Sequence, residues 1–169
     1  KTTIPSAEVS PGAALALHHV ASIATNVPVR WLGIRYPADK SEEATGIPLR
    51  AGKQAIHDAT RILSTTTPLT HPYWLREDGA AGIARVSDPS LIGLPENPPP
   101  YPVEFRFEIA GQTLVVADEP VQTSGSSDQR LAVVAPLSLQ FPAPVALFAP
   151  GATHGVEVEV VSATPSATG

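Results

Sequence analysis

Proline limits most strongly what this chain can fold into. It occupies 19 of the 169 positions, roughly twice ordinary usage. Because proline lacks a backbone N–H and its ring clashes with the preceding helical turn, few uninterrupted stretches remain for α-helices. A mainly helical fold is therefore disfavoured. Hydrophobic residues still make up 43% of the chain, which is enough to fill a core, so disorder driven by charge is excluded.

Charge and cysteine content exclude several functional classes. The chain has 11 Lys and Arg against 16 Asp and Glu, a net charge of −5, so no basic surplus exists to neutralise phosphates and we expect no nucleic-acid partner. The absence of Cys excludes disulfides, thiolate metal ligands and a cysteine nucleophile. No apolar run approaches the ~20 residues of a transmembrane helix, so we expect no membrane span. The chain begins at Lys1 without any Met, which predicts a piece of a longer protein.

Alternation of apolar and polar residues predicts strands along most of the chain. Predicted strands cover residues 15–23, 27–36, 54–64, 103–109, 113–117, 131–141 and 156–160. The segment 54–64 also has helical spacing, but no capping signal marks a helix start, so we interpret it as a strand. The other segments predict loops or turns, at 37–53, 123–127 and 68–102, the last with a short strand at 82–86.

About seven short strands without intervening helices predict an all-β fold, an antiparallel immunoglobulin-like or fibronectin-III-like β-sandwich. We expect this sandwich to span residues 1–141. Residues 142–169 either complete it with a further strand or begin a following module. The expected core includes Trp31, Phe105, Phe107 and Leu137.

Five histidines raise the question of a metal centre. His18 and His19 are adjacent on a predicted strand and so point to opposite faces, and no His-x-His or His-x-x-x-His spacing occurs. His57 and Asp58 are likewise neighbours on a strand, which argues against a catalytic dyad. We interpret the carboxylate pairs at 42–43 and 118–119 as solvated loop charges. The sequence therefore predicts no catalytic residue, no metal site and no cofactor.

Aromatic side chains are the remaining candidates for ligand binding, because flat rings stack on sugars in carbohydrate-binding sandwiches. The alternative is a place in the core, which we expect for Trp31. Tyr73 and Trp74 follow Pro72 in a turn-rich region, where a place in the core is favoured less strongly than for Trp31. The candidate platform for a carbohydrate ligand therefore consists of Trp74, Tyr73 and Tyr101.

Two stretches are more specific than these patterns. Residues 70–75 read Thr-His-Pro-Tyr-Trp-Leu, and residues 91–99 read Leu-Ile-Gly-Leu-Pro-Glu-Asn-Pro-Pro. With the strand at 105–109 and Glu-Pro-Val at 119–121, they resemble the immunoglobulin-like region that follows the catalytic domain in large bacterial PIG-L (LmbE-like) deacetylases. The resemblance covers roughly residues 9–141, and the chain departs from the family pattern at 122–126.

The resemblance implies a non-catalytic accessory domain of a zinc-dependent hydrolase, an N-deacetylase of glycans or glycoconjugates. The catalytic His-Pro-Asp-Asp motif of that family has no counterpart, because His57-Asp58 lacks the proline and the second acid and His71-Pro72 is followed by Tyr73. We therefore expect that this chain is not itself an enzyme.

The partners implied by the resemblance are the catalytic domain of the same parent chain and carbohydrate, and the implied location is extracytoplasmic, either secreted or periplasmic. One alternative is a carbohydrate-binding module with Trp74 and Tyr73 as its platform. The other is a self-contained hydrolase whose histidines are united by folding.

Overall fold

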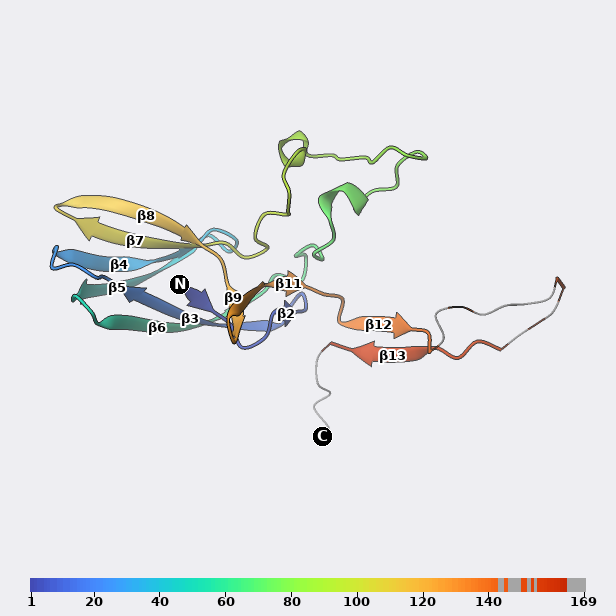
Figure 1. Cartoon of the computed structure of the whole chain (residues 1–169), viewed down its shortest axis with the longest axis horizontal. Coiled ribbons are helices and arrows are strands. Elements are labelled where there is room, and N and C mark those ends of the chain that lie inside the picture. Colours follow the sequence, from blue (N-terminus) through green and yellow to red (C-terminus); the bar gives the residue numbers. More distant parts are fainter. Residues whose placement is uncertain (143–144, 146–149, 152, 154, 164–169) are drawn as a thin grey trace.

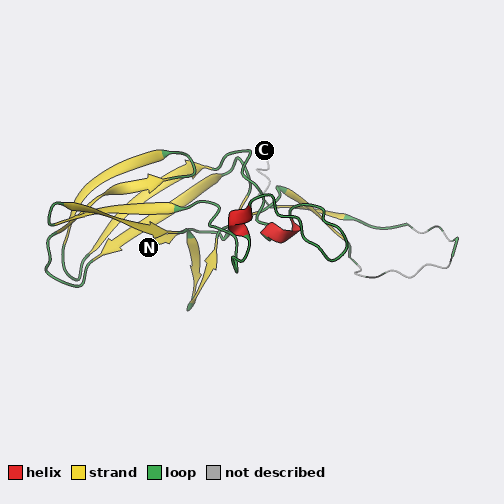
Figure 2. Ribbon diagram, turned by 90° about the horizontal axis from the view of Figure 1, so that it is seen from above, coloured by secondary structure: helices red, strands yellow, loops and turns green. Residues whose placement is uncertain are grey.

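The computed structural model describes residues 1–142, 145, 150–151, 153 and 155–163. Two sheets face each other and form a β-sandwich (Figures 1 and 2), so the predicted all-β character is confirmed. The larger sheet has the order β10-β9-β1-β3-β6, and the smaller sheet has the order β5-β4-β7-β8. Most strand pairs are antiparallel, while β1–β9 and β2–β11 are parallel. The strands are β1 (Thr2–Thr3), β2 (Glu8–Val9), β3 (Ala14–Ser22), β4 (Val29–Tyr36), β5 (Ser41–Leu49), β6 (Gln54–Ile62), β7 (Val103–Ile109), β8 (Gln112–Asp118), β9 (Val121–Ser124), β10 (Ser127–Arg130), β11 (Ala132–Val133), β12 (Leu137–Gln140) and β13 (Glu159–Ser162).

The period-two pattern of β3 organises the larger sheet. Alternate residues of β3 are buried, namely Leu15, Leu17, His19 and Ala21. β3 pairs with β6 along its whole length, so the ambiguous segment 54–64 is a strand, as predicted. The residues between the buried ones face outward, which is the arrangement expected for a sheet with one covered face.

The smaller sheet supplies most of the aromatic core. Trp31 and Phe105 are buried, and their ring centroids lie 5.5 Å apart. Beside them, β4 shifts its register at a bulge between Trp31 and Gly33. A Cβ at Gly33 would overlap the backbone carbonyl of Glu43, so only glycine fits at this close approach of β4 and β5.

Three predicted loops or turns differ in the structure. Residues 37–53 contain β5, residues 121–130 form the β9–β10 hairpin, and the expected strand at 82–86 is reduced to a single bridge between Glu77 and Arg85. The sequence analysis did not predict β5 because most of its inward-facing residues are polar. Ser41, Glu43 and Thr45 face inward, and only Ile47 and Leu49 at the end of β5 add apolar inward-facing side chains. The first half of the strand therefore lacks the usual apolar face.

The chain after β11 leaves the sandwich. Among the described strands, β12 pairs only with β13, in a separate two-stranded sheet that extends away from the two large sheets (Figure 1). Leu137, expected in the core, is 59% exposed on β12, so that prediction is wrong: alternation identified an apolar face, but the sandwich does not cover it. The β12–β13 pair crosses the predicted boundary at residue 141. Among the described residues, none of the helices has the length and apolar character needed to cross a membrane.

Candidate functional site

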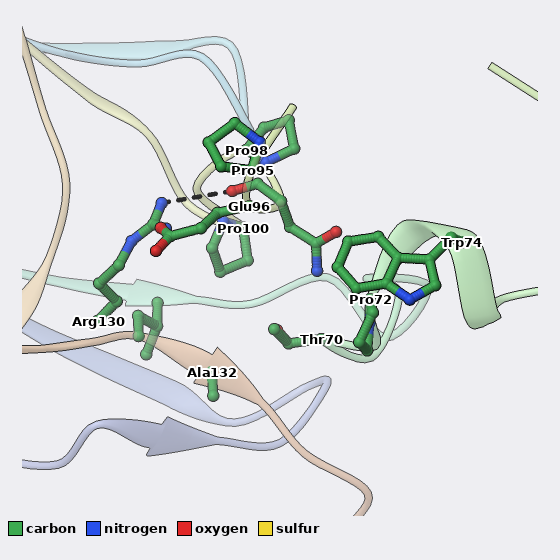
Figure 3. Close-up of a pocket in the computed structure, with 11 residues that line it drawn as sticks. Thr70, Pro72, Trp74, Pro95, Glu96, Pro98, Pro100, Arg130 and Ala132 are labelled. Atoms are coloured by element: carbon green, nitrogen blue, oxygen red, sulfur yellow. Dashed lines mark hydrogen bonds and ion pairs between the residues drawn. The ribbon is translucent and has the colours of Figure 1, made fainter. Parts of the chain in front are cut away.

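A surface cleft of about 390 Å³ lies where the turn-rich segment 70–100 folds against β10 and β11 (Figure 3). One side carries the indole of Trp74 and the ring of Pro72, and the other carries Arg130 and Glu96. The cleft therefore combines an apolar wall with a charged wall. That combination is typical of small-molecule sites, where apolar contact supplies affinity and polar groups fix orientation.

A short 3₁₀-helix, Tyr73–Leu75, places Trp74 at the cleft. The side chain of Asn97, from the second resemblance stretch, holds this helix. Its Oδ1 accepts a hydrogen bond from the Tyr73 backbone N–H at 3.0 Å, and its Nδ2 donates to the His71 carbonyl at 2.7 Å. One amide thus satisfies two backbone groups and fixes the two stretches against each other.

Thr70 attaches the same segment to the sandwich. Its backbone N–H donates to the Val133 carbonyl, and its Oγ1 accepts from the Val133 N–H, both at 2.8 Å. Val133 is buried in the core. The cleft is therefore built on the body of the sandwich.

The structure separates the three residues of the predicted platform. Trp74 is 40% exposed and lines the cleft. Tyr73 is 9% exposed. Its ring contacts the Trp74 indole edge to face, with 4.9 Å between the ring centroids and 88° between the ring planes. Its hydroxyl donates to the Leu94 carbonyl and accepts from the Gly93 N–H.

Tyr101 belongs to the core rather than to a platform. It is 2% exposed, and its hydroxyl donates to Asp39 Oδ2 at 2.8 Å. Burial, together with this hydrogen bond to a carboxylate, raises the pKa of Tyr101 above its ordinary value. With Tyr73 and Tyr101 both buried, the ring face open to a ligand at the predicted platform is that of Trp74.

The charged wall is an ion-pair network centred on Arg130. Its guanidinium pairs with Glu96, and its Nε donates to Glu119 Oε2 at 2.8 Å. Because Arg130 and Glu96 remain partly exposed, their unused donors and lone pairs can bind hydroxyl groups of a ligand.

The histidines take separate structural roles. His18 is exposed and pairs with Asp58 at 2.6 Å, while His19 points into the sandwich, so the two neighbours do face opposite sides. His57 points inward and contacts Glu43 Oε2 at 2.6 Å, and Arg61 pairs with the same carboxylate. Glu43 is therefore not a solvated loop charge, since it lies on β5 and joins it to β6.

His19 and Tyr36 form a buried polar contact. His19 Nε2 lies 3.0 Å from the Tyr36 hydroxyl, and the Arg61 guanidinium lies over the Tyr36 ring at 4.2 Å from its centroid. Burial first, and the nearby Glu43 charge second, raise the pKa of Tyr36 to about 12. Tyr36 is therefore neutral near pH 7, and its contact with His19 connects β4 of one sheet with β3 of the other.

No group of three or more His, Asp or Glu side chains that could hold a metal ion occurs among the described residues. His154, one of the five histidines, lies outside them.

Comparison with family models, curated proteins and solved structures finds no match for this chain. The relation to PIG-L-like deacetylases therefore stays a prediction based on the two motif stretches.

The sequence identified Trp74 as a candidate binding residue because it is an aromatic residue among turn residues. The sequence did not show that Asn97 holds the segment that carries Trp74, because the hydrogen-bond partners of Asn97 lie more than twenty positions away.

Proposed function

We propose that this chain is a non-catalytic β-sandwich module of a PIG-L-like, zinc-dependent glycan deacetylase, which docks substrate or orients the catalytic domain of the same parent chain. The observation that carries the proposal is the joining of the two motif stretches. Tyr73 from the first stretch and Asn97 from the second are directly hydrogen-bonded, and together they build the Trp74 cleft. The residues that suggest the family thus form one structural unit with a surface suited to a ligand.

The immunoglobulin-like classification belongs to the same proposal. It is supported by two facing sheets of mostly antiparallel strands around one core. An extracytoplasmic location follows from the proposed parent enzyme.

The test of this proposal is an acetate-release assay on an N-acetylglucosamine oligomer. We expect the purified chain with added zinc to release no acetate. Added to a PIG-L-like catalytic domain, or fused to it, we expect the chain to raise kcat/KM for the oligomer. Acetate release by the chain alone, or an unchanged kcat/KM in its presence, would contradict the proposal.

A second candidate is an independent carbohydrate-binding module, and the exposure of Trp74 favours it. A buried indole would have left no stacking surface. Trp74 is instead 40% exposed and lines the same cleft as the Arg130–Glu96 pair. Stacking of a sugar ring on the indole and hydrogen bonds to the charged wall would share the binding energy.

Calorimetric titration with soluble oligosaccharides tests this candidate. Loss of an aromatic platform removes ~1–3 kcal/mol by analogy with base stacking on aromatic side chains, so we expect Trp74→Ala to weaken binding about 5- to 150-fold. Leu75→Ala is the matched control, because Leu75 is exposed on the same 3₁₀-helix but does not line the cleft. Equal weakening by both variants, or no binding by the unmodified chain, would exclude the candidate.

A further inference from the structure

The outer strand β8 has features that the proposed function does not use. It lies at the end of the smaller sheet with β7 on one side and no second neighbour among the described strands. Its apolar residues Leu114, Val115 and Val116 are each close to half exposed. An outer strand with unpaired N–H and C=O groups and exposed apolar side chains is a template for pairing with another strand.

The other outer strands carry protecting residues that β8 lacks. β5 contains Pro48 and adjacent glutamates, β6 contains Asp58 and Arg61, and β10 contains Asp128 and Arg130. In β8 the one charged residue is Asp118, at its last position. Proteins normally block exposed strand edges with charges, prolines or bulges. The unprotected edge of β8 therefore indicates that another strand pairs with it.

The turn that precedes β8 identifies which backbone groups are free. Ala110 and Gly111 both have positive φ, the geometry of a two-residue type I′ hairpin turn, and the closing pair of such a hairpin is Ile109 with Gln112. Hydrogen-bonded pairs then alternate along the ladder. The backbone groups of Thr113, Val115 and Ala117 therefore point away from β7, toward the open edge.

The order of residues in β8 suits antiparallel pairing with itself. If the strand is paired about a two-fold axis through Val115, Leu114 of one copy lies opposite Val116 of the other, on the face that continues the sandwich interior. Thr113 then lies opposite Ala117 and Gln112 opposite Asp118, so no like charges meet. A two-fold arrangement also pairs the β8 edges of both copies at once, so the contact closes at two copies.

We propose that β8 is a dimerisation edge, at which a second copy of this chain pairs antiparallel through Val115 and joins the two four-stranded sheets into one continuous sheet. The inference is independent of the Trp74 cleft, which involves none of these residues.

Sedimentation equilibrium of the unmodified chain is the first test, at concentrations from about 10 µM to about 1 mM. We expect the mass to double with rising concentration and not to increase further. Val115→Lys places two ammonium groups at the axis, and we expect it to remain monomeric throughout. Ile56→Lys is the matched control, because Ile56 has the same exposure, 51% against 50% for Val115, on the outer strand β6. We expect it to dimerise like the unmodified chain.

A cysteine variant keeps the test decisive if Val115→Lys fails to fold. The chain has no Cys, so a single introduced thiol reports only on its own contacts. Hydrogen-bonded antiparallel pairs have Cα atoms about 5.5 Å apart, within the range of a disulfide. We expect Val115→Cys to form a covalent dimer under mild oxidation and Ile56→Cys to remain monomeric. A monomer at every concentration, a polymer of growing mass, a dimer that survives Val115→Lys, or equal crosslinking at both positions would overturn the proposal.

Discussion

His19 shows at the residue scale how the interior of this sandwich depends on protonation. Its imidazole is fully buried between Thr2 Oγ1 and the Tyr36 hydroxyl, each 3.0 Å from a ring nitrogen. Burial, reinforced by repulsion from the nearby His57, lowers the pKa of His19 to about 4, against an ordinary value of 6.5. The folded protein therefore holds His19 neutral at pH values at which the unfolded chain already binds a proton.

This difference predicts acid sensitivity. The free energy of unfolding should fall as the pH drops from 6.5 to about 4, because the unfolded state binds more protons in that window. The loss attributable to His19 is at most about 3 kcal/mol. Urea denaturation at several pH values measures it. We expect His19→Gln to flatten the pH dependence of the free energy of unfolding. An identical slope in His19→Gln and the unmodified protein would contradict the assignment.

The aromatic core gives a second prediction for single residues. Phe105 is buried against Trp31 and His19, whereas Phe107 is only partly buried. Phe105→Ala should lower the free energy of unfolding by about 3–5 kcal/mol, the usual loss when a buried Phe is truncated. Phe107→Ala should cost distinctly less. Chemical denaturation of the two variants compares them directly, and equal losses would contradict the burial described for the pair.

At the scale of elements, the segment from residue 70 to residue 100 is held by side-chain hydrogen bonds more than by its own regular structure. Asn97→Ala removes the hydrogen bonds to the Tyr73 N–H and to the His71 carbonyl, each with a net contribution of about 1 kcal/mol. We expect faster tryptic cleavage at Arg76 and Arg85, with the sandwich itself still folded. Asn26→Ala, at an exposed turn, is the control. Unchanged cleavage in Asn97→Ala would show that this amide does not hold the segment.

Strands with a clear apolar face were predictable from the sequence, and those without one were not. β7 follows strict alternation of apolar and charged residues, so its sequence identified both the strand and its buried face. In β3 the period of two identified the strand, although both of its faces are rather apolar. β5 was missed because Glu43 and Thr45 face inward, where Glu43 meets partners on β6. Such partners become neighbours only after folding. Alternation also assigned Leu137 to the core, since a pattern shows which face is apolar but not what covers it.

Of the three residues predicted to form the binding platform, only Trp74 has an exposed ring at the cleft. Trp74 stands among turn residues that leave a large ring few places to bury itself. Tyr73 has the same local context, yet its ring turns inward because its hydroxyl finds the backbone of residues 93 and 94. Tyr101 lies in the core, where its hydroxyl donates a hydrogen bond to Asp39. These outcomes depend on partners that are distant in sequence, and local composition does not reveal them.

At the scale of the whole molecule, stability resides in the two large sheets. No residue of β12 or β13 belongs to the core cluster, and a lone two-stranded sheet contributes little stability by itself. A chain that ends at Pro136 should therefore unfold within a few degrees of the full chain, as measured by calorimetry. A large drop in Tm on this truncation would mean that the β12–β13 sheet stabilises the sandwich.

The central proposal concerns the whole molecule as well: we propose that the β-sandwich uses the exposed indole of Trp74 to bind a carbohydrate. Tryptophan fluorescence tests it most directly, because the chain has two Trp residues and Trp31 is fully buried. Titration with N-acetylglucosamine oligomers should give a saturable change in emission that disappears in Trp74→Phe, while the Trp31 signal stays constant. Emission that does not change at any oligomer concentration, or a change that persists in Trp74→Phe, would contradict the account.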